Sequence, residues 1–129
     1  MTDRGEIETL LRSLYAARAR GDLAGVVETF TPGAKFEISG ASDAHAISVI
    51  ALGLDEYRAW LAVMIKSFKL TDLTILSILI DGDNAAVHWR AKIHSNITGR
   101  TVLTEFVDLV RIAQRRIDSY TEFFVPRDA

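Results

Sequence analysis

The sequence predicts an α+β fold in which three N-terminal helices pack on a curved antiparallel sheet. Apolar residues recur with the helical period in three segments of the first half, whereas the second half is rich in alternating and β-branched stretches. No repeat, low-complexity tract or linker interrupts the 129 residues. We therefore expect residues 1–129 to form a single domain.

Three apolar stripes predict the helices. The first starts at Ile7 with spacings of i, i+3, i+4 and i+7, and Asp3 and Gly21 supply its start and stop signals. The second is expected to begin after Asp22 and to carry its stripe as far as Phe30. The third begins near Asp55. Its stripe consists of Tyr57, Trp60, Leu61, Met64 and Phe68.

Alternation and turn signals predict one short strand and about four long ones. The short strand covers residues 34–39, and residues 39–53 after it have no clear period, which indicates a loop or a hidden turn of helix. Turn signals at Asp81-Gly82 and Thr98-Gly99 separate the first three long strands. The long strands are expected at residues 70–80, 87–94, 102–112 and 117–125.

The composition excludes several classes of protein. Fifteen Lys and Arg against 17 Asp and Glu give a net charge of −2 without a block of like charge, so no nucleic-acid partner is expected. There is no cysteine, and no metal or phosphate-loop motif occurs. The longest apolar stretch, Ile47–Leu54, is too short to span a bilayer, and the polar N-terminus is unlike a secretory signal. We expect a cytoplasmic protein without a membrane partner.

The strand at residues 102–112 is apolar on both faces. Phe106 and Val110 lie on one face, and Leu103, Val107 and Leu109 lie on the other. Helices from the first half of the chain can cover only one of these faces. We therefore expect a homodimer that forms through the open face of the sheet.

Four segments together resemble the nuclear transport factor two-like superfamily, which includes ketosteroid isomerases and SnoaL-like polyketide cyclases. Residues 15–23 with Phe30 resemble its opening helices, residues 53–61 its third helix, and residues 107–112 and 116–124 its last two strands. The resemblance covers nearly the whole chain. It implies a cystatin-like fold with a cone-shaped pocket between helices and sheet, but this fold carries many activities.

Asp108 is the strongest candidate for chemistry. A two-residue turn at Thr98-Gly99 would place Trp89 opposite it, and a turn one residue earlier would place Val87 there; both registers keep Asp108 on the face of Trp89. Burial against an apolar wall should raise the pKa of this carboxyl. The protonated acid could then donate to an oxyanion, as an aspartic acid does in ketosteroid isomerases. The alternative is a structural aspartate bonded to a core tyrosine or to the backbone.

Other positions depart from the family's catalytic patterns. Ile38 stands where the isomerases have their proton-shuttling aspartate, and Leu14 stands where they have an oxyanion-hole tyrosine, although Tyr15 is adjacent. Phe106 occupies the arginine position of the Arg-x-Asp pattern in epoxide hydrolases of this fold. The sequence therefore disfavours steroid isomerisation and epoxide hydrolysis.

Tyr120 and Glu122 form a second candidate group. Periodicity leaves the inward face of their strand open, and the resemblance favours Tyr120, Glu122 and Phe124 inward, near Asp108. Two neighbouring carboxyls make a plausible acid–base pair, whereas the alternative is that Glu122 pairs with an arginine at the sheet edge. His45 is a candidate base in the irregular segment, or an ordinary loop histidine.

Several mostly apolar and aromatic residues are candidates to line the pocket or, alternatively, to fill the core. They are Tyr15, Phe30, Phe36, Ile38, Trp60, Trp89, Phe106 and Phe124. The leading hypothesis is a cofactor-independent, SnoaL-like isomerase, cyclase or lyase acting on an apolar carbonyl or aromatic compound. Asp108, Tyr120, Glu122 and His45 would supply its chemistry. The alternatives are a non-catalytic ligand-binding or accessory domain and a purely structural dimer.

Overall fold

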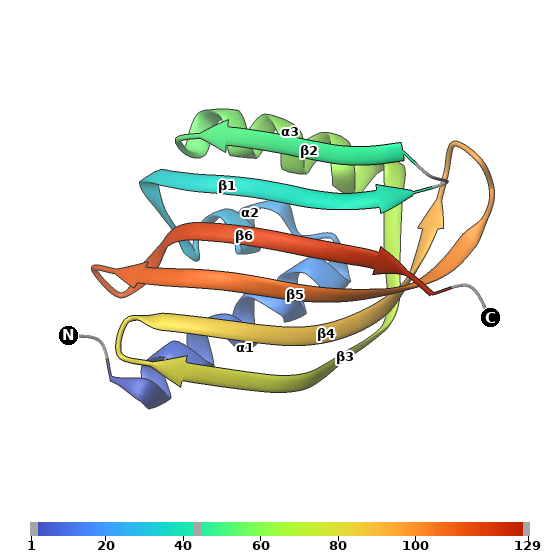
Figure 1. Cartoon of the computed structure of the whole chain (residues 1–129). Coiled ribbons are helices and arrows are strands. Elements are labelled where there is room, and N and C mark those ends of the chain that lie inside the picture. Colours follow the sequence, from blue (N-terminus) through green and yellow to red (C-terminus); the bar gives the residue numbers. More distant parts are fainter. Residues whose placement is uncertain (1–2, 43–44, 128–129) are drawn as a thin grey trace.

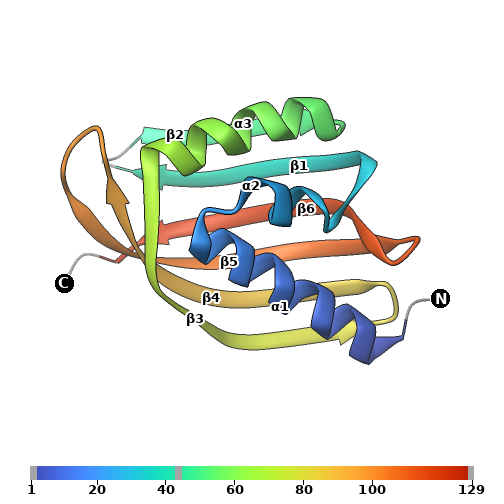
Figure 2. The same ribbon diagram turned by 180° about the vertical axis from the view of Figure 1, so that it is seen from behind.

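The computed structural model describes residues 3–42 and 45–127, without the side chains of 41, 42 and 45–47. It confirms the α+β class: a curved six-stranded sheet carries helices on one face (Figures 1 and 2). The helices are α1 (Arg4–Arg20), α2 (Leu23–Val27) and α3 (Leu54–Ser67). The strands are β1 (Phe30–Ser42), β2 (His45–Leu52), β3 (Phe68–Asp81), β4 (Asn84–Ser95), β5 (Thr101–Ala113) and β6 (Arg116–Pro126).

The helix ends follow the capping residues of the sequence. The carboxylate of Asp3 accepts a hydrogen bond from the Gly5 N–H at the start of α1, and Gly21 ends this helix with a φ of 67° that suits glycine. Asp22 caps α2 in the same way through Gly25. The expectation that the second helix reaches Phe30 is wrong, because Phe30 already pairs with Ile117 as the first residue of β1.

The sheet is mixed rather than antiparallel, which corrects the predicted topology. The strand order is β2-β1-β6-β5-β4-β3, and β1 runs parallel to its neighbour β6. Parallel neighbours require a long connection. Here that connection includes β2, α3 and the β3–β5 meander, so the two strands come from opposite ends of the chain (Figure 1).

The segment expected to be a loop or a hidden turn of helix forms a hairpin instead. β1 continues to Ser42, and β2 pairs with it in antiparallel register, with Ile38 opposite Val49. Alternation is hidden in this segment because residues 39–46 are small or polar, whereas residues 49–52 are apolar at every position, so neither stretch marks a single face. Its far strand is the free edge of the sheet, where Leu52 is 61% exposed.

The hairpin between β4 and β5 adopts the second of the two expected registers. Val87 lies opposite Asp108 and Trp89 lies opposite Phe106. The turn is therefore centred one residue earlier than Thr98-Gly99. The register change leaves the facing of every side chain intact, because alternation has a period of two.

Two irregularities shape the sheet. The pairing of β3 with β4 shifts near Asp72, whose φ is 53°, and β3 descends from the end of α3 before it turns into the sheet (Figure 2). The pairing of β5 with β6 shifts between Arg111 and Ile112, so that Ile117 and Tyr120 are both buried although they are three residues apart. This bulge explains why periodicity left the inward face of β6 ambiguous.

The helices cover one face of the sheet and leave the other open. Side chains from α1, α3 and the inner face of β4–β6 form the core, with Leu11, Leu14 and Val87 fully buried. Five apolar residues on the opposite face of β5 and β6 are 39–54% exposed. We call this surface the open face; it consists of Leu103, Val107, Leu109, Phe123 and Val125. Within the described residues, no helix is both long and apolar enough to cross a membrane.

Candidate functional site

A cavity of about 930 Å³ lies between the helices and one end of the sheet. Its wall is formed by the end of α1, by α3, by the beginning of β3, by the β4–β5 hairpin and by the end of β6. Apolar residues dominate this wall. They include Ile38, Val49, Trp60, Leu61, Met64, Ile65, Phe68, Leu70, Ile93, Val102, Phe106 and Phe124. A cavity of this size and character suits a small organic molecule.

A buried ion pair interrupts the apolar wall. Arg18 of α1 donates from Nη1 to Glu122 Oε1 of β6 over 2.5 Å, and the two side chains are only 9% and 3% exposed. Both residues line the cavity. With the described residues, neither Glu122 Oε2 nor Arg18 Nη2 makes a hydrogen bond, so each partner keeps at least one polar atom for a bound molecule. This pairing corrects the idea of an arginine at the sheet edge, because the partner comes from a helix.

The sequence reasoning missed Arg18, although the pattern contained it. The stripe of α1 runs through Leu11, Leu14 and Tyr15, and the next position at i+7 from Leu11 is Arg18. A charged residue on the buried stripe of an amphipathic helix requires a buried partner. Burial alone would lower the pKa of Arg18, but the charges of Glu122, Tyr120 and Asp108 raise it well above the usual value, so the guanidinium remains a cation.

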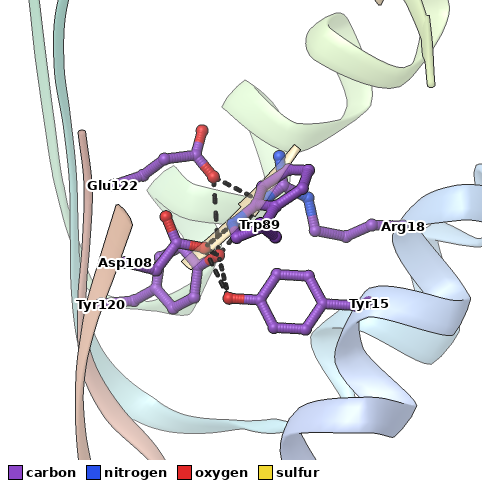
Figure 3. A network of polar contacts seen from close by, with 6 residues as sticks. All are labelled: Tyr15, Arg18, Trp89, Asp108, Tyr120 and Glu122. Carbon is purple, nitrogen blue, oxygen red and sulfur yellow. Dashed lines mark hydrogen bonds and ion pairs between the residues drawn. The ribbon is translucent and has the colours of Figure 1, made fainter. Parts of the chain in front are cut away.

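Asp108 is the centre of a polar cluster behind this wall (Figure 3). Its Oδ2 accepts from the hydroxyl of Tyr15 over 2.5 Å, from Nε1 of Trp89 over 2.6 Å and from the hydroxyl of Tyr120. Its Oδ1 is buried and has no hydrogen-bond partner among the described residues. The carboxyl is fully buried and does not line the cavity.

The environment of Asp108 shifts its protonation. Burial, followed by the nearby charge of Glu122, raises its pKa to about 8, although Arg18 and the hydroxyls of Tyr120 and Tyr15 oppose the shift. Burial likewise raises the pKa of Tyr15 and of Tyr120 well above the usual value. Near neutral pH the cluster therefore holds a protonated acid and two neutral phenols.

Tyr120 and Trp89 connect the cluster to the ion pair. Nη1 of Arg18 donates to the Tyr120 hydroxyl over 3.1 Å, and its guanidinium carbon lies 4.9 Å from the centre of the Trp89 ring. The ring of Phe106 stacks on the ring of Trp89, with the two centroids 3.7 Å apart. Asp108 is therefore connected to the cavity-lining residue Arg18 only indirectly, through Tyr120 and Trp89.

The model of the SnoaL-like domain matches residues 11–120, which is most of the chain. The chain belongs to the SnoaL-like family. The resemblance to the nuclear transport factor two-like superfamily is therefore confirmed.

Similar proteins agree on the fold of this SnoaL-like chain. An uncharacterized protein of Mycobacterium tuberculosis is 27% identical over 124 residues, which cover 96% of this chain and 92% of its own length. A putative isomerase from Bacillus subtilis has a TM-score of 0.82 at 16% identity, covering 97% of this chain and 90% of its own. A putative SnoaL-like polyketide cyclase from Mesorhizobium loti has a TM-score of 0.68 at 16% identity, covering 95% and 98% respectively.

The predicted pocket residues of the SnoaL-like chain divide into two groups. Four of them line the cavity: Ile38, Trp60, Phe106 and Phe124. The other four lie in the core behind it: Tyr15, Phe30, Phe36 and Trp89. Phe30 and Phe36 both pack on Tyr57, with ring centroids 4.6 Å and 4.2 Å away. Phe30 and Phe36 therefore pack behind the cavity and do not line it.

The predicted catalytic residues divide in the same way. Glu122 lines the cavity, whereas Asp108 and Tyr120 lie behind it. The resemblance favoured an inward orientation of Tyr120, Glu122 and Phe124 on β6. This orientation is confirmed, because Tyr120 and Glu122 are buried and Phe124 lines the cavity. The backbone of His45 begins β2, but its side chain lies outside the described residues.

Proposed function

We propose that this chain is a cofactor-independent acid–base enzyme of the isomerase, cyclase or lyase type, acting on an apolar carbonyl or aromatic compound. The observation that carries the proposal is the buried Arg18–Glu122 pair, which faces a mostly apolar cavity with at least one unbonded polar atom on each partner. A carboxylate beside a fixed cation suits proton abstraction next to a carbonyl group.

The proposed reaction begins with proton transfer to Glu122. Its Oε2 takes a proton from the carbon next to the carbonyl, and the electron pair of the broken C–H bond moves onto the carbonyl oxygen. Arg18 Nη2 donates to that oxygen as its negative charge develops. Glu122 then returns the proton to another carbon of the same molecule; alternatively, the carbonyl re-forms, the electron pair expels a leaving group as a C=C bond forms, and that group takes the proton from Glu122. Neither step needs an oxidant or a reductant.

Asp108 is a positioning residue in this scheme. It accepts from the Tyr120 hydroxyl, which in turn accepts from Arg18 Nη1 at 3.1 Å. The protonated acid adds no negative charge, whereas its ionised form would compete with Glu122 for Arg18. We therefore expect the protonation of Asp108 to set the pH range in which Arg18 can donate a hydrogen bond to the carbonyl oxygen of the ligand.

The experiment measures exchange of the α-protons of β-tetralone for deuterium by NMR, with binding of β-naphthol followed by the fluorescence of Trp60 and Trp89. The wild type should bind the naphthol and accelerate the exchange, and Glu122→Gln should lose the acceleration by about a hundredfold or more. Glu56→Gln is the control, because Glu56 is exposed and does not line the cavity. Glu122→Asp, which keeps the charge, guards against a folding defect.

The alternative function is ligand binding without turnover. The observation that favours it is that Arg18 and Glu122 already bond each other at 2.5 Å and so form a closed pair. Tight naphthol binding by the wild type with no faster exchange would support this alternative. Absence of binding would overturn both functions.

A further inference from the structure

The net charge of the residues that line the cavity is positive, whereas the net charge of the whole chain is negative. The chain has a net charge of −2, yet among the described residues four cations and one anion line the cavity. The cations are Arg18, Arg20, Lys69 and Arg100, and the anion is Glu122. An acidic protein that gathers cations around a cavity favours an anionic ligand there.

Two of the four cations are already paired. Arg18 is neutralised by Glu122 in the buried part of the cavity, and Arg20 lies 3.3 Å from the carboxylate of Asp22. Lys69 and Arg100 are exposed, and neither has a carboxylate within 4.0 Å among the described residues. The unbalanced positive charge therefore lies at the mouth of the cavity.

The backbone holds these two cations on one rim. Lys69 lies beside Phe68, which pairs with Ser95, and the Ser95 N–H donates to the carbonyl of Arg100 over 2.9 Å. Asn96 fixes the hairpin to the junction of α3 and β3, because its backbone and its side chain donate to the carbonyls of Ser67 and Lys66, each over 2.8 Å. The β4–β5 hairpin therefore forms a fixed side of the mouth, close to the start of β3 (Figure 2).

Apolar side chains lie on the same rim. Trp60, Phe68 and Ile97 line the cavity but remain 45%, 42% and 77% exposed. Large apolar residues beside unpaired cations suit a ligand that has an apolar body and a charged end.

We propose that the ligand is an amphipathic anion, whose charged group binds Lys69 and Arg100 at the mouth while its apolar body extends toward Arg18 and Glu122. This inference rests on the proposed function of the same cavity and adds the charge of the substrate. A carboxylate and a phosphate monoester share the required chemistry.

The test compares ligands with one ring system and different charges. β-Naphthaleneacetate and β-naphthaleneacetamide have nearly the same shape and differ in charge, and β-naphthyl phosphate distinguishes phosphate from carboxylate recognition. Binding to the wild type is measured by the fluorescence of Trp60 and Trp89 at low and high salt. The acetate should bind about five- to tenfold more tightly than the amide at low salt, and high salt should remove the advantage.

The variant Lys69→Gln/Arg100→Gln should lose the preference for the anion and keep the affinity for the amide. Lys35→Gln/Arg58→Gln is the charge-matched control, because both residues are exposed and neither lines the cavity. Equal affinity for acetate and amide in the wild type would overturn the inference and leave the proposed function standing. A preference that survives the double substitution would also overturn it, since the anion would then bind elsewhere. Failure of the amide and the acetate to bind would overturn the proposed function as well.

Discussion

Arg18 Nη1 and Glu122 Oε1 lie 2.5 Å apart in a setting where both side chains are more than nine-tenths buried. The pair joins the first helix to the last strand, across 104 positions of sequence. Each charge depends on the other, because both are almost wholly removed from bulk water. This dependence gives the first prediction.

Loss of one partner should destabilise the protein strongly. Arg18→Met leaves the Glu122 carboxylate buried without its cation, and we expect the free energy of unfolding to fall by about 3–5 kcal/mol. Arg18→Met/Glu122→Met should recover most of the loss, since a buried ion pair can be replaced by apolar side chains at little cost. Urea unfolding monitored by circular dichroism measures both.

An exposed ion pair supplies the control for that experiment. Arg12 and Glu8 lie 3.0 Å apart on α1 with side chains 57% and 48% exposed. Arg12→Met should change stability by less than about 1 kcal/mol. Similar losses for Arg12→Met and Arg18→Met would contradict the importance given to burial.

Asp108 should make stability depend on pH. Its pKa of about 8 in the folded chain is raised above the ordinary value of an unfolded aspartate, so its contribution is fully present below about pH 4 and is lost as the pH rises toward 8. Between these limits the wild type should lose stability relative to Asp108→Asn, with a slope of at most about 1.4 kcal/mol per pH unit. Urea unfolding of both proteins at several pH values checks this, and parallel curves would refute it.

Tyr15 should hold the pKa of Asp108 below the value that burial alone would give. Its hydroxyl donates to Oδ2 over 2.5 Å and thereby stabilises the charged carboxylate. Tyr15→Phe should therefore raise the pKa of Asp108, measured by carbon NMR of the side-chain carboxyl. Tyr57→Phe is the matched control, because Tyr57 is also buried but makes no hydrogen bond to Asp108. An unchanged pKa in Tyr15→Phe would exclude this role.

The parts of the fold that the sequence predicted are those with a local signal. Capping residues and apolar stripes mark the helix starts at Asp3 and Asp22, and strand alternation places Asp108 on the face of Trp89. The pairing of β1 with β6 has no such signal, because the two strands are separated by most of the chain. The turn at residues 96–100 could not be fixed from Thr98-Gly99 alone, since several loop lengths accommodate one glycine.

The candidate site was harder to predict than the fold. Asp108, Tyr120 and Glu122 could be placed on inward faces, but their distance from the cavity depends on side-chain packing. The Arg18–Glu122 pair and the stacked rings of Trp89 and Phe106 stand between Asp108 and the cavity. Such layering comes from contacts between distant elements, and periodicity carries no information about it.

Gly40 should control the position of a cavity side chain. A Cβ at this position would overlap the ring of Phe124, which lines the cavity. Gly40→Ala should displace that ring, cost about 1–3 kcal/mol of stability and weaken naphthol binding. Gly33→Ala is the control, because a Cβ there meets no atom within 4 Å. Unchanged binding and stability in Gly40→Ala would show that Phe124 moves without consequence.

The open face of the sheet gives the last prediction. Val107 lies opposite Phe123 on β6 and His88 on β4, so it sits in the middle of this face, with 40% of its surface exposed. The helices all lie on the other side (Figures 1 and 2), so in the described part of the chain no helix covers this face. We propose that a second copy of the chain covers it, because a twofold axis would bring the same apolar residues together.

Sedimentation velocity should therefore find a dimer at micromolar concentration, and Val107→Lys should convert it to a folded monomer. A lysine at this position would place a charge against the same charge of the partner, in the least polar part of the contact. Val63→Lys is the control, because Val63 is 58% exposed on α3, on the side of the sheet that the helices cover. A monomeric wild type, or a dimer that survives Val107→Lys, would show that the two copies do not meet through the open face.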